Sequence, residues 1–122
     1  KSVDLLKAAC GWDDFTEEDL LAVGAREYCL SRLLDVHTQE LTDPKEQWDK
    51  LVPERWFRDA LPNGPEKGAL AYGGDKSALF DVALPAYWKE RGWTEDKGIP
   101  TLETLKALGI DDIAGDIAQQ HL

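Results

Sequence analysis

The stretch from Ala83 to Thr101 constrains the fold of this chain more than any other part of it. Apolar residues recur at helical spacing in its first half, and Gly92 follows where helices often end with a positive φ. Gly98-Ile-Pro100 is a second break, after which Thr101 can cap a new helix. We therefore predict a fixed corner in which Trp93 folds back on the preceding helix with its Tyr-Trp pair.

The N-terminal third predicts two helices separated by a turn. A short helix to about Ala9 is expected to turn Leu5 inward. Thr16 and Asp19 have the spacing of a capping box, in which two side chains bond reciprocally to backbone N–H groups of the first turn. The next helix is therefore expected to begin there and to run to about His37.

This long helix is apolar on nearly all sides. One stripe holds Leu20, Val23, Leu30 and Leu34, and another holds Ala22, Cys29, Leu33 and Val36. A helix of this kind is usually enclosed by other elements. Gly24 costs roughly 1 kcal/mol relative to Ala inside a helix, which predicts a close approach by another helix or backbone. Buried arginines need carboxylate or carbonyl partners, so we expect such a partner for Arg26 or Arg32. The candidates within the chain are Glu27, Asp35 and Glu54, and a group outside the chain is the alternative.

Residues 38–76 show little periodicity. Asp43-Pro44 is expected to begin a short helix that carries Trp48 and Leu51, and Pro53 is expected to break it. The segment is also unlike disorder, because it contains large apolar side chains that need burial: Trp48, Trp56, Phe57, Leu61 and Tyr72. We predict a long ordered strap between residues 38 and 76, wrapped over the helices or over another domain.

Three more helices are expected after the strap. Ser77 can cap the first, which is expected to kink at Pro85 before it reaches the corner. The others are expected over Thr101–Leu108 and from Asp111 or Asp112 to Ala118. Since no segment alternates as a strand does, we predict an all-α fold of about four to six helices, with residues 1–122 forming a single helical domain.

Charge and composition exclude several classes of function. The chain carries 24 acidic and 14 basic residues, a formal net charge of −10. No cluster of Lys and Arg is available for phosphates, which argues against binding to nucleic acid or to anionic membranes. No apolar run approaches the ~18 residues of a membrane span. Met is absent, so we expect a processed chain or a piece of a longer one.

No motif of the sequence carries a reaction by itself. Cys10 and Cys29 have apolar neighbours, where Cys behaves as a small hydrophobe. His37 is expected at a helix end, where the dipole favours positive charge, and His121 is expected to be mobile. Metal sites need three or four converging ligands, and these four scattered residues do not indicate one. From the residues alone we assign no catalytic, cofactor-binding or metal-binding residue.

Four stretches in order along the chain nevertheless resemble one family. They are Ala8-Ala-Cys-Gly-Trp-Asp13 with Thr16-Glu-Glu18, Gly24-Ala-Arg26 with Leu30-Ser-Arg-Leu-Leu-Asp35, Leu51-Val-Pro-Glu-Arg55 with Gly64-Pro-Glu-Lys-Gly68, and Tyr87-Trp-Lys-Glu-Arg-Gly-Trp93 with Gly98-Ile-Pro-Thr101. Together they resemble the C-terminal domain of the aldehyde:ferredoxin oxidoreductases, which are tungsten-pterin and iron–sulfur enzymes. Ala25 and Asp35 depart from the acid and the Asn usual in the family.

The resemblance implies a role inside a larger cytoplasmic enzyme that oxidises aldehydes to carboxylic acids. Electrons would pass from tungsten-bispterin through a [4Fe–4S] cluster to ferredoxin, and the N-terminal part of the enzyme would hold both cofactors. This piece would pack on that part and shape the substrate channel, with Arg26, Arg32 and Asp35 as candidates to face another domain or the channel.

Further expectations concern the chain on its own and the alternatives to this role. The 122-residue chain alone is expected to be inactive, to expose apolar surface and to self-associate. A free-standing helical interaction module without catalytic activity is the alternative reading, and a divergent relative with a changed substrate is a third.

Overall fold

The computed structural model describes residues 1–39 and 52–122. Its α-helices are α1 (Ser2–Cys10), α2 (Glu17–Gln39), α4 (Arg55–Arg58), α5 (Leu84–Glu90), α6 (Leu102–Ala107) and α7 (Asp111–His121). A 3-10 turn, η1 (Ala71–Gly74), and a π-helical segment, η2 (Ala78–Ala83), precede α5. The described ranges contain no strand, only one isolated bridge between Trp93 and Pro100. These elements confirm the predicted all-α class.

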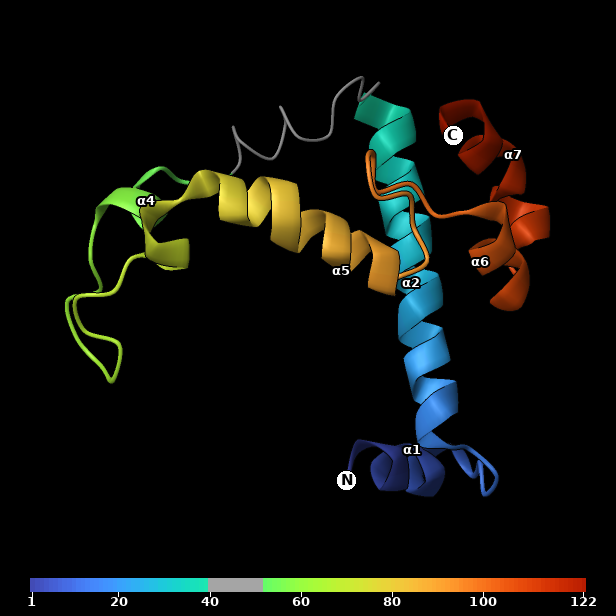
Figure 1. Ribbon diagram of the computed structural model, residues 1–122. Coiled ribbons are helices and arrows are strands. Elements are labelled where there is room, and N and C mark those ends of the chain that lie inside the picture. Colours follow the sequence, from blue (N-terminus) through green and yellow to red (C-terminus); the bar gives the residue numbers. More distant parts are fainter. Residues whose placement is uncertain (40–51) are drawn as a thin grey trace.

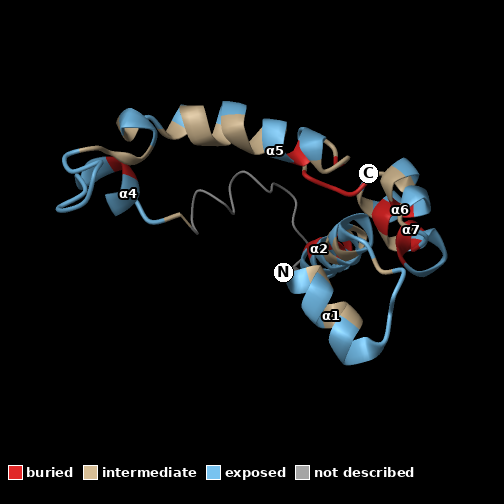
Figure 2. Cartoon of the chain, turned by 90° about the horizontal axis from the view of Figure 1, so that it is seen from below, coloured by how far each residue is buried: buried red, intermediate tan, exposed pale blue. Residues whose placement is uncertain are grey.

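Helix α2 is the axis around which the other elements are arranged (Figure 1). Helices α6 and α7 lie along one side of it, and α1 crosses its N-terminal end. The C-terminal end of α5 meets the middle of α2, and η2 leads away from there toward α4. Buried residues gather where α2, α6, α7 and the end of α5 meet, whereas α1 has only exposed and intermediate residues (Figure 2). In the part of the chain that the structure describes, no helix has both the length and the apolar character needed to cross a bilayer.

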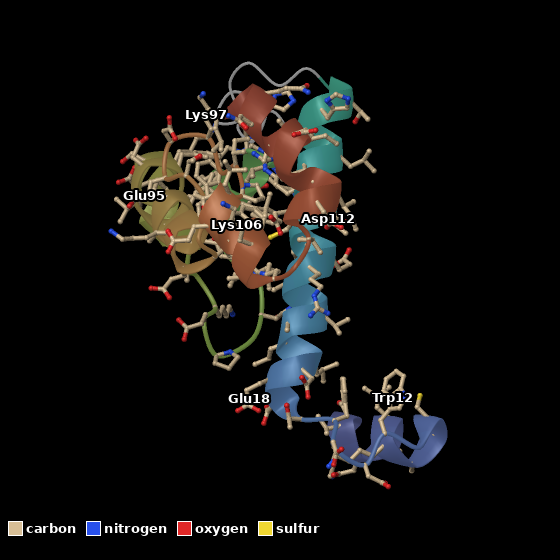
Figure 3. The ribbon with its side chains drawn as sticks, turned by 90° about the vertical axis from the view of Figure 1, so that its right-hand side faces the viewer. Trp12, Glu18, Glu95, Lys97, Lys106 and Asp112 are labelled. Atoms are coloured by element: carbon tan, nitrogen blue, oxygen red, sulfur yellow. The ribbon has the colours of Figure 1, made fainter. Side chains whose placement is uncertain are left out.

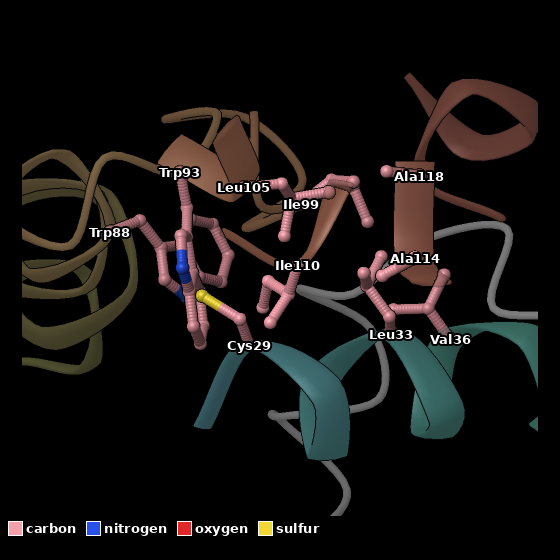
Figure 4. Packing of buried hydrophobic residues seen from close by; sticks show 10 residues of the cluster. All are labelled: Cys29, Leu33, Val36, Trp88, Trp93, Ile99, Leu105, Ile110, Ala114 and Ala118. Atoms are coloured by element: carbon pink, nitrogen blue, oxygen red, sulfur yellow. The ribbon is translucent and has the colours of Figure 1, made fainter. Parts of the chain in front are cut away.

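The core lies between α2 and the C-terminal helices (Figure 4). Its buried residues are Cys29, Leu33, Val36, Trp88, Trp93, Ile99, Leu105, Ile110, Ala114 and Ala118. The small side chains Ala114 and Ala118 face Leu33 and Val36, so α7 can lie close against α2. Leu105 of α6 is fully buried. The core therefore depends on packing between helices that are far apart in the sequence.

The capping box predicted at Thr16 and Asp19 is confirmed. The Asp19 N–H donates to Thr16 Oγ1 at 3.1 Å, and the Thr16 N–H donates to Asp19 Oδ2 at 2.8 Å. The Thr16 hydroxyl also donates to Asp19 Oδ2 at 2.7 Å. These hydrogen bonds, first the side-chain one, lower the pKa of Asp19 below its ordinary value of 3.8. The start of α2 is thus fixed locally.

Stability should depend on pH through this carboxylate. Because the pKa of Asp19 is lower in the folded chain, its contribution is present above the ordinary value of 3.8 and is lost as pH falls through the lowered pKa. We expect the thermal midpoint of the wild type to fall more steeply than that of Asp19→Asn between about pH 5 and pH 2. Asp14→Asn, in the adjoining turn, is the control. Parallel curves for wild type and Asp19→Asn would contradict the assignment.

Helix α1 differs from the prediction because its side chains are not buried. Leu5 was expected to point inward, but its side chain is 71% exposed, and α1 has no buried residue. Trp12, in the turn after α1, is 52% exposed and packs on Phe15, with 5.4 Å between ring centroids. The inward orientation predicted for α1 is therefore wrong within this chain, since no described element covers the helix.

The described part of the strap, residues 52–76, is folded but lies away from α2 (Figure 1). Phe57 is buried at 7% exposure, as expected. Burial was also expected for three other large side chains, but they are about half exposed: Trp56 at 52%, Leu61 at 50% and Tyr72 at 51%. This part does not wrap over the helices, so a covering domain stays the prediction. The short helix expected at Asp43-Pro44, with Trp48 and Leu51, lies outside the described residues.

The segment that leads into the corner differs from the prediction in two places. Ser77 makes no side-chain cap, and Asp75 takes that role by accepting the Ser77 N–H at 2.9 Å. Pro85 stands in the first turn of α5, where its missing N–H is tolerated, and the π-helical turns of η2 precede it. Where a kink was expected, the chain thus changes from π-helix to α-helix.

Candidate functional site

The corner between α5 and α6 forms as the sequence predicted. Gly92 has a φ of 69°, and its N–H donates to the carbonyl of Lys89 at 2.9 Å. The backbone N–H of Trp93 donates to the carbonyl of Trp88 at 2.9 Å. The Trp93 ring meets Tyr87 edge to face, with 6.4 Å between centroids, and is 7% exposed. The prediction that Trp93 packs on the helix carrying Tyr87 and Trp88 is therefore confirmed.

Two glycines of the corner have no room for a side chain. A Cβ at Gly98 would fall on the indole of Trp88, and a Cβ at Gly92 would fall on the hydroxyl of Thr104. Thr104 Oγ1 instead donates to the carbonyl of Gly92 at 2.6 Å. Thr101 also donates to this carbonyl at 3.0 Å, while its hydroxyl caps α6 as predicted. The corner is thereby fixed to both of its helices.

Arg32 fixes the corner to α2. Its Nε donates to the carbonyl of Gly98 at 2.9 Å, and its Nη2 donates to the carbonyl of Lys97 at 3.0 Å. The residue is 9% exposed, and this burial lowers the pKa of the guanidinium, with a smaller opposing effect from Asp35. The carbonyl partners expected for Arg32 are confirmed, and they lie 65 and 66 residues away in the sequence.

Loss of this guanidinium should destabilise the chain. Arg32→Met keeps an unbranched side chain but leaves two partly or fully buried carbonyls without their donor, so we expect a loss of about 1–3 kcal/mol in the free energy of unfolding. Urea denaturation followed by circular dichroism measures it. Arg26→Met is the matched control on the same helix, because the exposed side chain of Arg26 donates to only one carbonyl, that of Leu108. Equal losses in the two variants would contradict this role of Arg32.

The other two candidates from the sequence are placed differently. Arg26 is exposed, and its Nε donates at 2.9 Å to the carbonyl of Leu108, which ends α6. Asp35 is exposed, and its carboxylate hydrogen-bonds to no described residue. The structure brings Arg26 and Arg32 to carbonyls of their own chain, whereas the Asp35 carboxylate has no hydrogen-bond partner among the described residues. That any of the three faces another domain or a channel stays a prediction.

A groove beside the corner presents a cation that the sequence analysis did not single out. The guanidinium of Arg91 lies 4.4 Å from the centroid of the Tyr28 ring and 5.0 Å from that of Tyr87. The groove measures about 600 Å³, and Cys29 and Trp93 also line it. Tyr28 and Arg91 are 63 positions apart, so the sequence does not indicate their contact. The only sequence signal for Arg91 is its place in the corner motif. Glu90 also lines the groove, so the guanidinium is held over two aromatic rings in a groove that also contains a carboxylate residue.

The thiols and imidazoles of the chain do not form a metal centre in the described ranges. Cys10 is exposed, whereas Cys29 is buried beside Trp93, and burial raises the pKa of its thiol (Figure 4). His121 was expected to be mobile, but its ring packs edge to face on His37, with 5.8 Å between centroids. Among residues 1–39 and 52–122, no three His, Cys, Asp or Glu side chains converge as ligands.

The C-terminal end of α7 is held by the corner. Lys97 Nζ donates to the carbonyls of His121 at 3.3 Å and Leu122 at 3.2 Å. In Figure 3, Lys97 lies at the end of the molecule opposite to Trp12. The corner therefore contacts α2, α5, α6 and α7.

Comparison of this chain with known proteins identifies its relatives. The family model described as "Aldehyde ferredoxin oxidoreductase, domains 2 & 3" matches residues 1–110. The tungsten-containing aldehyde ferredoxin oxidoreductase of Pyrococcus furiosus is 41% identical over 107 residues, which are 88% of this chain and 16% of that protein. The Pyrococcus horikoshii protein of the same name is 37% identical over 109 residues, 89% of this chain and 16% of its own length.

The Thermococcus kodakarensis protein of that name is 38% identical over 107 residues, again 16% of its length. No solved structure gives a significant match. The chain thus spans about a sixth of the length of these relatives, and the match includes α2, the corner and α6. On this evidence the chain belongs to the aldehyde ferredoxin oxidoreductase family and corresponds to part of domains 2 and 3 of that family.

Proposed function

We propose that this chain is the C-terminal helical domain of a tungsten-dependent enzyme that oxidises aldehydes to carboxylic acids and passes the electrons through a [4Fe–4S] cluster to ferredoxin. The observation that carries the proposal is the family match over residues 1–110, with 37–41% identity to enzymes named for tungsten, aldehyde and ferredoxin. The chain packs on the cofactor-binding part of that enzyme and shapes the substrate channel. Its two free cysteines suit the reducing cytoplasm.

The residues of this chain do not supply the ligand set of an iron–sulfur cluster. A four-iron cluster normally takes four thiolates, and the chain has two cysteines, one exposed and one buried against Trp93. The described residues offer no convergent ligand set either. What the chain supplies is a rigid corner and a long helix that position surfaces for the rest of the enzyme.

The test compares the 122-residue chain with the full-length product of its gene. Both are produced in cells that make the tungsten-pterin cofactor and are then supplied with iron and sulfide, and aldehyde-dependent dye reduction is recorded together with the visible spectrum. We expect turnover and a cluster spectrum from the full-length protein, and neither from the chain alone. Stoichiometric iron or turnover in the chain alone would overturn the proposal, as would a full-length protein that oxidises no aldehyde.

The channel role is tested separately through Asp35. Its exposed carboxylate has no hydrogen-bond partner among the described residues, so Asp35→Asn should leave the fold unchanged. In the full-length enzyme we expect a changed KM for aldehydes with an unchanged melting temperature. An unchanged KM across aldehydes of increasing length would place Asp35 outside the channel.

A further inference from the structure

Helix α2 has a second apolar surface that no described element covers. Val23 is 49% exposed, Leu30 is 37% exposed and Leu34 is 61% exposed. They stand seven and four positions apart, so they share one face of the helix. We call these three residues the outer stripe. The core-facing residues Cys29 and Leu33 are 2% exposed and lie roughly a third of a turn around the helix.

We propose that the outer stripe is the surface of this chain on which the rest of the same enzyme chain packs. The inference rests on the proposed function and names the interface that this function requires. Single exposed apolar residues are common on protein surfaces, but here three lie in line over three turns of one helix, with the exposed Arg26 and Glu27 between Val23 and Leu30.

The size of the relatives argues for this occupant. The match covers 16% of each relative, so most of the chain of such an enzyme lies outside it. A surface on the same chain has a high effective concentration, so it binds the outer stripe in preference to a separate protein. Interfaces between domains of one chain commonly bury enough area to cover three helical turns.

Gly24, next to the stripe, is an independent sign of a close neighbour. A Gly inside a helix is less favourable than Ala, yet nothing lies within 4 Å of the position where its Cβ would stand. The described residues therefore do not require a glycine there, and the close helix crossing that the sequence predicted is not formed within them. A backbone segment from the rest of the enzyme that packs closely against α2 at this point would require a glycine.

The edge of the stripe indicates the chemistry of the partner surface. Glu27 borders the stripe, and its carboxylate accepts the hydroxyl of Ser31 at 3.0 Å. No cation pairs with it among the described residues. An apolar patch with a basic residue at its edge would complement this surface, since interfaces combine an apolar centre with a polar rim.

A matched pair of leucines on α2 provides the test. Leu34 belongs to the outer stripe and is 61% exposed, while Leu21 is 67% exposed on another face of the helix. Leu34→Glu and Leu21→Glu are made both in the 122-residue chain and in the full-length enzyme. In the 122-residue chain we expect both variants to keep the wild-type circular dichroism and melting temperature.

In the full-length enzyme we expect Leu34→Glu to accelerate limited proteolysis at the C-terminal part by about tenfold or more, and Leu21→Glu to leave it unchanged. Equal proteolysis of the two variants in a full-length enzyme that still oxidises aldehydes would overturn the inference but not the proposed function. A dimer that Leu34→Glu separates into monomers of unchanged protease resistance would assign the stripe to a second copy, and would also overturn it.

Discussion

Trp93→Ala is expected to lower the free energy of unfolding by about 3–5 kcal/mol, the largest loss that truncation of one buried aromatic residue produces. The indole is 7% exposed and meets the Tyr87 ring of α5 edge to face. It lies beside Cys29 of α2 (Figure 4). Its removal loses the apolar burial of the ring and leaves a cavity where α2 and the corner meet. The backbone beside that cavity is held by the hydrogen bonds of Gly92 and Thr101, which limits its collapse.

Urea denaturation followed by far-ultraviolet circular dichroism measures this loss, since the substitution itself changes tryptophan fluorescence. Trp12→Ala is the control, because that ring is 52% exposed and contacts Phe15 in a surface turn. We expect its cost to be about 1 kcal/mol or less. Similar midpoints for the two variants would show that Trp93 is not part of the core.

The second large effect is expected from Gly98→Ala. The new Cβ would fall on the buried indole of Trp88, and the residue has a φ of 64°, where L-residues are strained. Overpacking costs about 1–3 kcal/mol and left-handed backbone about 1–2 kcal/mol, so a total of roughly 2–5 kcal/mol is expected. Arg32 bonds to the carbonyl of Gly98, so a shifted backbone would also weaken the bond to α2.

Gly109→Ala separates the two contributions to this loss. Gly109 has nearly the same φ, 67°, but nothing lies within 4 Å of the position of its Cβ. Its substitution should therefore show the backbone strain alone, about 1–2 kcal/mol. The difference between the two variants then measures the collision with Trp88. If the two melting temperatures agree, the corner has room that the structure does not show.

The corner and the capping box could be predicted from the sequence because both are local. Gly92, Thr101 and the pair of Thr16 and Asp19 act on residues within a turn or two of themselves. Their residue types have few other uses at such positions. The cap at Ser77 was misassigned because Asp75, two residues earlier, has the same capping chemistry, and the sequence does not rank the two.

The partners of Arg32 and Arg91 could not be predicted by the same reasoning. The spacing along α2 indicated that Arg32 needs a carbonyl or carboxylate, but its carbonyls belong to residues 65 and 66 positions away. The contact of Arg91 with Tyr28 has the same long-range character. Such pairs are decided by how helices pack, which residue periodicity does not specify.

The errors on burial have a common physical cause. Leu5 and Trp56 are apolar and were expected to be covered, and each is more than half exposed. Apolar residues in a sequence indicate which surfaces are covered in the whole protein. The relatives of this chain are about six times as long as the matched part, so the cover can lie outside it. The sequence predicted that these surfaces need a cover, but not which part of the protein provides it.

The bonds from Arg32 to the corner also have a consequence for the rate of folding. The helices and the corner itself rely on contacts that form quickly, whereas the Arg32–Gly98 bond closes a loop 66 residues apart in sequence. Docking of the corner on α2 is therefore expected to be the slow step. Loop-closure entropy changes by only about 0.6 kcal/mol for each doubling of loop length. Insertions in the exposed turn at residues 62–67 should therefore change stability little, provided that Arg32 and Gly98, which close the loop, are kept.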